Sequence, residues 1–285
     1  MEQKFYELTN PQKSIWYTDE FYQGTPINNV GGTLLISDPV DFSLLQKAIK
    51  EFILSNDALK IKVKVINDIP KQYLDLSAKD YPIEISKVHS NDEVSQIEHT
   101  LINTPFDLSD QFLFRFRIYQ FEDGHGGFSA VLHHLISDAW SMSLLIDQII
   151  NIYVSLIENS DAPVEAKPSY LDYISSEKEY QLSEKFQKDK NFWSETFASL
   201  PEFASIATST ISDNSSLAKR KEFILEKELT QKINEFCKKQ KSSPFGFFMG
   251  LIAIYLSRVS NTPNVTIGTP ILNRSNFKEK NTIGM

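Results

Sequence analysis

The hydrophobic and polar residues of the first hundred positions repeat with the spacings of helices and strands in turn. Apolar residues three and four apart predict a helix over residues 42–55. Residues 59–66 alternate between apolar residues and lysines, which is typical of a half-buried strand. Further elements are expected as strands at 30–36, 71–75 and 82–87 and as helices after Thr9 or Asn10 and near 92–103.

The pattern is sharpest in the middle of the chain. Residues 112–121, FLFRFRIYQF, place four apolar side chains on one face of a strand. The turn residues EDGHGG follow, and residues 128–134, FSAVLHH, form the return strand of a loose hairpin. Ser137 or Asp138 then caps a helix that runs to about Glu158.

Residues 159–168, NSDAPVEAKP, are polar and carry two prolines, which indicates a linker or lobe boundary. The remaining elements are expected as helices at 169–181, 184–199, 228–240 and 244–258 and as strands at 220–226 and 264–268. Strands and helices are mixed without regular alternation. This order favours the α+β class over a doubly wound parallel sheet.

Composition narrows the class of protein. Of 285 residues, 41% are apolar, which is enough for a packed core, and the net charge of −8 argues against a nucleic-acid binder. The only cysteine, Cys237, excludes an internal disulfide and a multi-thiolate metal site. The N-terminus has no apolar signal core, and the apolar run at 244–256 is too short to span a bilayer. We therefore expect a soluble cytoplasmic protein.

Two adjacent histidines, His133 and His134, end the return strand, and Asp138 follows. Neighbouring side chains in a strand point to opposite faces, so one histidine can meet a cleft while the other is held inside. The pair does not fit a zinc site, and no nucleophile motif or glycine-rich phosphate loop accompanies it. Two interpretations remain open: a histidine that acts as a general base or hydrogen-bonding post, since imidazole ordinarily titrates near cellular pH, and two structural histidines.

The string from Leu132 to Ser141, LHHLISDAWS, resembles the His-His-x-x-x-Asp-Gly signature of nonribosomal peptide synthetase condensation domains. That signature is shared by chloramphenicol-acetyltransferase-like acyltransferases. Other blocks are similar to the family in order and spacing: residues 8–29, residues 55–63, Tyr170 with Asp172 and Tyr173, Gly268-Thr269-Pro270 with Asn273-Arg274, and Ile283-Gly284-Met285. The opening block, residues 55–63 and GTPILNRSNFKEK look most like the starter condensation domains of surfactin-type lipopeptide synthetases.

The resemblance implies a two-lobed, chloramphenicol-acetyltransferase-like fold with a tunnel between the lobes. It implies an acyltransferase that joins a donor acyl thioester, a fatty or 3-hydroxy fatty acyl group for a starter domain, to the α-amino group of an aminoacyl-carrier acceptor. The implied partners are carrier-protein domains and an adjacent adenylation domain. The domain would hold no cofactor, and its substrates would ride on 4'-phosphopantetheine or on coenzyme A. The alternatives are an ordinary condensation domain, a free-standing acyl-coenzyme A acyltransferase and a non-catalytic carrier-docking domain.

The resemblance also implies roles for particular residues. His134 would be the catalytic histidine that faces the tunnel, and His133 would be structural. Asp138 would pair with a basic side chain, here Lys60 where the family has arginine, or with another partner. Ala139 replaces the family's glycine and puts full activity in doubt if the backbone there needs a positive φ or a close approach of the substrate. The remaining residues expected at the tunnel or the second-lobe wall are Trp140, Ser141, Asn273 and Arg274.

The same comparison implies how the chain divides. Residues 1–168 are expected to form a whole first lobe, and residues 169–285 only the early part of a second lobe. The segments with which the family closes its tunnel would lie beyond Met285. The chain is therefore expected to be a C-terminally truncated fragment that carries the catalytic histidine without a finished active site.

Overall fold

The computed structural model describes residues 3–158, 167–199, 206 and 221–285, which form two compact units. The first consists of Met1–Leu182 together with Leu272–Met285, and the second of Ser183–Ile271. These units divide at a different place from the lobe boundary expected after residue 168, because the C-terminal segment and the helix after residue 169 pack on the first unit. That residues 169–285 are a partial second lobe stays a prediction.

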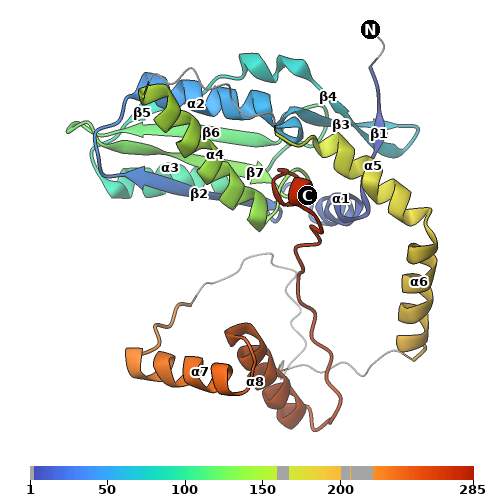
Figure 1. Ribbon diagram of the computed structural model, residues 1–285. Helices are drawn as coiled ribbons and strands as arrows, with labels where there is room; N and C mark the ends of the chain where they lie inside the picture. The colour runs from blue at the N-terminus through green and yellow to red at the C-terminus, as the bar shows by residue number, and fades with distance from the viewer. Residues whose placement is uncertain (1–2, 159–166, 200–205, 207–220) are drawn as a thin grey trace. The chain divides into compact units, whose positions relative to one another are not determined.

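A four-stranded sheet is the centre of the first unit (Figure 1). Its strands follow the order β2-β7-β6-β5, and only the β5–β6 pair is parallel. Their bounds are β2 (Asn29–Ile36), β5 (Glu84–Lys87), β6 (Phe114–Gln120) and β7 (Gly126–His133). Every residue of β7 is buried. Its Gly127 lies so close to the Leu34 carbonyl that a Cβ atom would overlap it.

Helices cover both faces of this sheet. On one face lie α2 (Phe42–Ser55) and α4 (Ala139–Ile157), which pack against each other and against the apolar face of β6. On the other face lies α3 (Asn91–Asn103), which contacts β2 and β7. Asp41 caps the N-terminus of α2 and Asp138 caps that of α4, since each carboxylate accepts from the backbone N–H groups of the first helical turn: Asp41 from two of them and Asp138 from one. The expected helices at 42–55 and after Asp138 are thus confirmed.

A second, smaller sheet has the order β1-β4-β3 and is antiparallel. Its strands are β1 (Tyr6–Glu7), β3 (Ile61–Ile66) and β4 (Ile69–Leu74). Helix α1 (Asn10–Phe21) follows β1 and begins with a capping box between Thr9 and Gln12. Leu59 and Lys60 do not belong to the strand expected over 59–66; they lie in a 3₁₀ turn, Asp57–Lys60, that precedes it.

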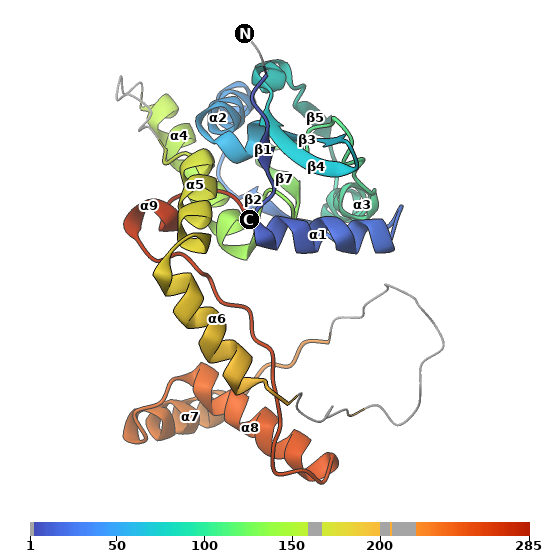
Figure 2. The ribbon, with the colours of Figure 1, turned by 90° about the vertical axis from the view of Figure 1, so that its right-hand side faces the viewer.

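The rest of the chain is helical or extended. In the first unit lie α5 (Tyr170–Gln181) and the short α9 (Phe277–Lys280) (Figure 2). In the second unit lie α6 (Glu184–Thr196), α7 (Lys227–Lys239) and α8 (Pro244–Val259). The strands expected at 220–226 and 264–268 are wrong for the described residues, where 221–226 and 264–268 form neither helix nor strand. Within the part of the chain that the structure describes, neither segment pairs with a neighbouring strand that could supply its backbone partners. The α+β class itself is confirmed.

Helix α4 is long and apolar enough to cross a membrane by length and hydropathy alone. Its Leu145, Ile149 and Ile152 are buried in the hydrophobic core of the first unit. This is how the core helix of a globular domain behaves, since such a helix must bury an apolar stripe against its own sheet.

Candidate active site

His133 and His134 stand where β7 ends, and their side chains go different ways. The His133 ring is buried, and its Nε2 lies 3.0 Å from the Asp19 Oδ2 atom. Its Nδ1 accepts a hydrogen bond of 3.2 Å from the backbone N–H of Leu135. Because Nδ1 is an acceptor, the hydrogen-bond pattern assigns the proton to Nε2 and fixes the neutral tautomer. His133 is therefore held inside the fold on both of its ring nitrogens.

His134 is only partly buried, and its ring is held more loosely. Its backbone N–H donates to the carbonyl of Asn28 at 2.7 Å. Its Nδ1 atom is buried and has no hydrogen-bond partner among the described residues. Nε2 is thus the ring nitrogen that can meet a substrate. The strand expected over 128–134 ends one residue earlier, at His133, and His134 is the first residue of the turn that follows, which gives the two rings different surroundings.

Asp138 begins α4 and carries two bonds. One carboxylate oxygen accepts from the backbone N–H of Ser141 at 2.7 Å, and the other lies 3.0 Å from a guanidinium nitrogen of Arg274. The pairing expected between Asp138 and Lys60 is not formed, because Lys60 binds Asp57 three residues earlier at 3.0 Å. The alternative, that Asp138 finds another partner, describes the structure, and the partner is an arginine from the C-terminal segment.

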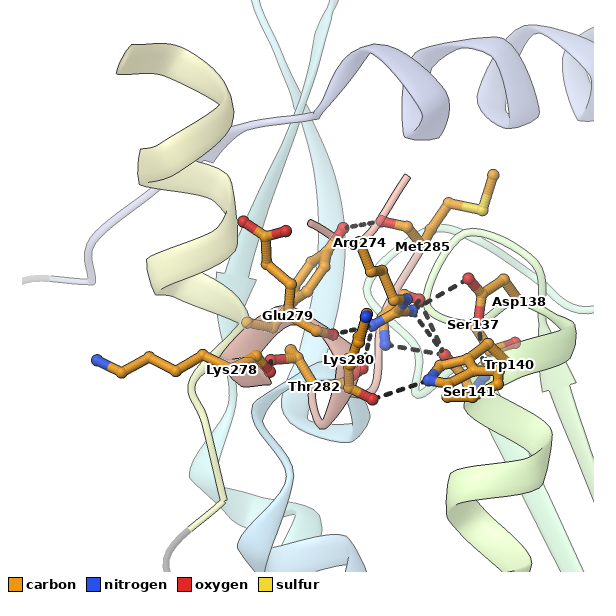
Figure 3. A network of polar contacts seen from close by, with 12 residues as sticks. Ser137, Asp138, Trp140, Ser141, Arg274, Lys278, Glu279, Lys280, Thr282 and Met285 are labelled. Atoms are coloured by element: carbon orange, nitrogen blue, oxygen red, sulfur yellow. Dashed lines mark hydrogen bonds and ion pairs between the residues drawn. The ribbon is translucent and has the colours of Figure 1, made fainter. Parts of the chain in front are cut away.

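Arg274 is at the centre of a network of hydrogen bonds that joins the C-terminal segment, residues 274–285, to the start of α4 (Figure 3). Its side chain is 5% exposed. One terminal nitrogen donates to the Glu279 carbonyl at 2.8 Å and to the carbonyl of Thr282. The other donates to the Gly284 carbonyl at 2.8 Å as well as to Asp138. The fork of the guanidinium suits this set of acceptors, which a point-like ammonium group would not span.

Of the other residues expected near the site, Ser141 and Trp140 bind the same C-terminal segment. Ser141 is buried; its hydroxyl donates to the Gly284 carbonyl at 2.9 Å. Trp140 donates from its indole N–H to the carbonyl of Lys280 at 2.8 Å. Ala139 is the first residue of α4 and does not have a positive φ. The backbone at this position therefore does not need a glycine for its conformation. Asn273 is exposed with φ 49°, a turn conformation beside Arg274.

The C-terminal residues fill a tight site. The hydroxyl of the buried Tyr170 donates to the Met285 carbonyl at 3.1 Å, and burial raises the pKa of this phenol. Gly284 lies against the Tyr170 ring so closely that a Cβ atom would overlap it. Ile283 is 2% exposed and belongs to the core of the first unit. The segment from Arg274 to Met285 is thus an integral part of this unit.

Four residues that hold the histidines were not predicted as site residues. Asp19 binds the His133 ring, the Asn28 carbonyl accepts from His134, and Gln12 binds the carbonyl of Leu135 with support from Gln72. Gln12, Asp19 and Asn28 belong to the opening block of the resemblance, residues 8–29, which is their only signal in the sequence. Within the described ranges, no three His, Cys, Asp or Glu side chains come together as a metal site.

These features together are those of a condensation domain. The sequence profile of that family, described as "Condensation domain", matches residues 2–285, and the chain belongs to the condensation domains of nonribosomal peptide synthetases. The chain is 36% identical over 294 residues to surfactin synthase subunit 1 of Bacillus subtilis (strain 168). That alignment covers 100% of this chain and 8% of that protein. The chain therefore spans less than a tenth of that relative's length.

Solved structures share the fold. The first condensation domain of the calcium-dependent antibiotic synthetase, in complex with a substrate analogue, matches with a TM-score of 0.83 at 17% identity, over 100% of this chain and 68% of that chain. A variant of the starter condensation domain of rhizomide synthetase, in complex with C8-CoA, matches with a TM-score of 0.80 at 17% identity, over 99% and 64%. The chloramphenicol-acetyltransferase-like resemblance thus led to the right fold.

Proposed function

We propose that this chain catalyses amide-bond formation between a donor acyl thioester and the α-amino group of an aminoacyl group on a carrier protein. One observation carries the proposal. His134 stands partly exposed on a turn whose backbone is held on both sides, while Asp138 is bound to Arg274 and to the backbone of Ser141. This arrangement leaves one imidazole nitrogen for a reacting group and holds the neighbouring backbone in place.

The chemistry follows from that nitrogen. The amine nitrogen attacks the thioester carbonyl carbon; the C–N bond forms, the C–S bond breaks and the thiol leaves. His134 Nε2 accepts the proton that the amine loses, or holds the amine in place through a hydrogen bond, and the sulfur gains a proton. A positioned base of this kind contributes about 10²–10⁴-fold to the rate. Orientation of the two bound thioesters supplies more.

The donor is proposed to be a fatty or 3-hydroxy fatty acyl group, as in a starter domain. Support comes from the similarity to surfactin synthase subunit 1 and from the fold shared with a starter domain that binds C8-CoA. The partners would be carrier-protein domains and an adenylation domain, with coenzyme A or phosphopantetheine bringing the substrates. A tunnel between two lobes belongs to the same proposal.

The test is substitution of His134 in the full protein. His134→Ala should lower amide formation by at least about 10²-fold while leaving the unfolding curve unchanged. Acyl-coenzyme A and acyl-carrier donors, each offered with the same aminoacyl-carrier acceptor, separate a starter domain from an ordinary one. Near-normal amide formation by His134→Ala would disprove the role of His134. Turnover with small free amines and no carrier would favour a free-standing acyltransferase.

A further inference from the structure

The two residues that flank His134 are both held by helix α1. Before it, the His133 ring nitrogen Nε2 lies 3.0 Å from the Asp19 carboxylate. After it, the Leu135 carbonyl accepts a hydrogen bond of 3.0 Å from the side-chain amide of Gln12. Gln12 and Asp19 are seven residues apart, which is about two helical turns, so they share one face of α1. A single rigid element therefore binds the chain on both sides of His134.

Gln12 is itself fixed by a pair of buried amides. Its nitrogen donates to Gln72 Oε1 at 2.9 Å, and the Gln72 nitrogen donates back to Gln12 Oε1 at 2.8 Å. Gln12 Oε1 also accepts the Thr9 backbone N–H at 2.9 Å, and Gln72 donates to the Glu7 carbonyl at 2.8 Å. Both glutamines are fully buried. Both donors and both acceptor positions of the Gln12 amide are used, so its orientation is determined.

The other contact point is equally constrained. Asp19 Oδ2 accepts from the Asn28 side-chain amide at 2.9 Å as well as from His133. The Asn28 carbonyl accepts the backbone N–H of His134 at 2.7 Å. The backbone of residues 133–135 is thus held from α1 and from the residue before β2, whereas the buried Nδ1 of His134 has no bond of its own among the described residues. The direction of the His134 ring depends on its backbone.

We propose that α1 is a clamp that positions His134 for the reaction, with Gln12 and Asp19 as its two contact points. This inference rests on the proposed function of His134 as base or hydrogen-bonding post. Neither contact residue reaches a substrate; each acts through a neighbour of His134. A displacement of about 1 Å at a reacting group can cost about 10²-fold in rate, so loosening the clamp should lower kcat more than it raises KM.

The first test removes the Gln12 contact point while keeping the length of the side chain. Gln12→Met loses the donor to Leu135, and with it the two bonds with Gln72 and the bond from the Thr9 backbone N–H. It should lower kcat for amide formation by about 10–100-fold and change the acceptor KM less than about threefold. The matched control is Asn56→Leu, because Asn56 is also a buried amide, and it donates to the Phe52 carbonyl of α2 and to Gln148 of α4 rather than to the residues around His134. The control should lose stability without losing kcat.

The second test separates geometry from charge at Asp19. Asp19→Asn keeps an oxygen that can accept from His133 and Asn28, so it should retain kcat within about threefold. Asp19→Leu removes that acceptor and should lower kcat as Gln12→Met does. These two variants test the clamp even if Gln12→Met fails to fold. The Asp19 side chain is 16% exposed, so replacing it should cost less stability than replacing the fully buried Gln12. Equal kcat for Asp19→Asn and Asp19→Leu would overturn the Asp19 contact.

A measurement without turnover keeps the two proposals apart. With isotope-labelled histidine, the His134 ring of the wild-type protein should give one sharp NMR signal, and Gln12→Met should broaden or split it while Asn56→Leu does not. A wild type that forms no amide but shows this pattern disproves the proposed function and supports the clamp. An unchanged His134 signal in Gln12→Met, or an equal loss of kcat in Gln12→Met and Asn56→Leu, overturns the clamp.

Discussion

Arg274 brings a positive charge into a nearly closed environment, and Asp138 together with backbone carbonyls surrounds that charge. A buried charge is costly unless it is paired and fully hydrogen-bonded, and removing one partner strands the other. The sequence predicts a structural or a tunnel-lining role for Arg274, and its contacts show that it anchors the start of α4, the helix that follows the histidines. A tunnel-lining role stays a prediction.

We predict that Arg274→Ala lowers the free energy of unfolding by about 3–5 kcal/mol, because the buried Asp138 pair is broken and the carbonyls of Glu279 and Gly284 each lose a donor. Arg274→Lys should recover little, since lysine lacks the guanidinium fork. Urea denaturation measures both. The control is Lys47→Ala, whose exposed pair with Glu51 at 3.8 Å contributes about 1 kcal/mol or less. Equal losses for Arg274→Ala and Lys47→Ala would contradict the prediction.

Asp75 gives a pH-dependent test. Its hydrogen bond with Lys62, together with bonds from Ser77, lowers the pKa of the Asp75 carboxyl from 3.8 to about 2. A carboxyl with a lowered folded-state pKa stabilises the fold above its unfolded pKa, and that contribution disappears as the pH falls through the folded value. Asp75→Asn should therefore cost about 1–2 kcal/mol at pH 6 and progressively less between pH 4 and pH 2. Urea curves of both proteins over this range measure the difference, and a constant difference would contradict it.

At the scale of elements, the periodicity of apolar residues predicts most helices and strands of the first unit, because the apolar face of each element packs into the core. The helix at 42–55 matches α2, and alternation located β6 and β7 within a few residues. Residues 264–268 have the composition of a strand, but they pair with no strand among the described residues, and a strand needs such a partner for its backbone groups. Lys60 was assigned to Asp138 by motif position, whereas a local 3₁₀ turn gives it Asp57. The motif located His133, His134 and Asp138, but no periodic signal marks Asp19 or Gln72, whose partners are far away in sequence.

The C-terminal segment is an element whose docking can be tested. Gly284→Ala places a methyl group in the Tyr170 ring, so either the ring or the segment must move. We expect a loss of about 1–3 kcal/mol in the free energy of unfolding and faster hydrogen exchange over residues 278–285, since Ile283 leaves the core. Tyr170→Leu in the same chain should restore part of that protection by making room. Unchanged exchange in Gly284→Ala would show that the contact is not tight.

At the scale of the whole chain, the described residues bury their apolar side chains very unevenly. The core cluster lies entirely in the first unit, where Leu45, Phe116 and Leu145 are closed off from solvent. In the described part of the second unit only Cys237 is a buried apolar residue, while Phe248 and Leu251 of α8 stay 43% and 47% exposed. Burial of apolar surface is the main stabilising contribution to a fold, so the two units should differ in stability.

We therefore predict that this 285-residue chain opens in parts rather than in one step. Backbone amides of α7 and α8 should exchange with deuterium at least about tenfold faster than those of β7 and α4 under native conditions, because few apolar contacts hold them closed. Residues 282–285 provide the internal control: they follow the second unit in sequence but pack on the first, through Ile283 and the bond from Tyr170 to Met285. They should exchange as slowly as the sheet. Protection of α8 equal to that of α4 would mean that the second unit has a core of its own, and rapid exchange at 282–285 would mean that the C-terminal segment is not part of the first unit.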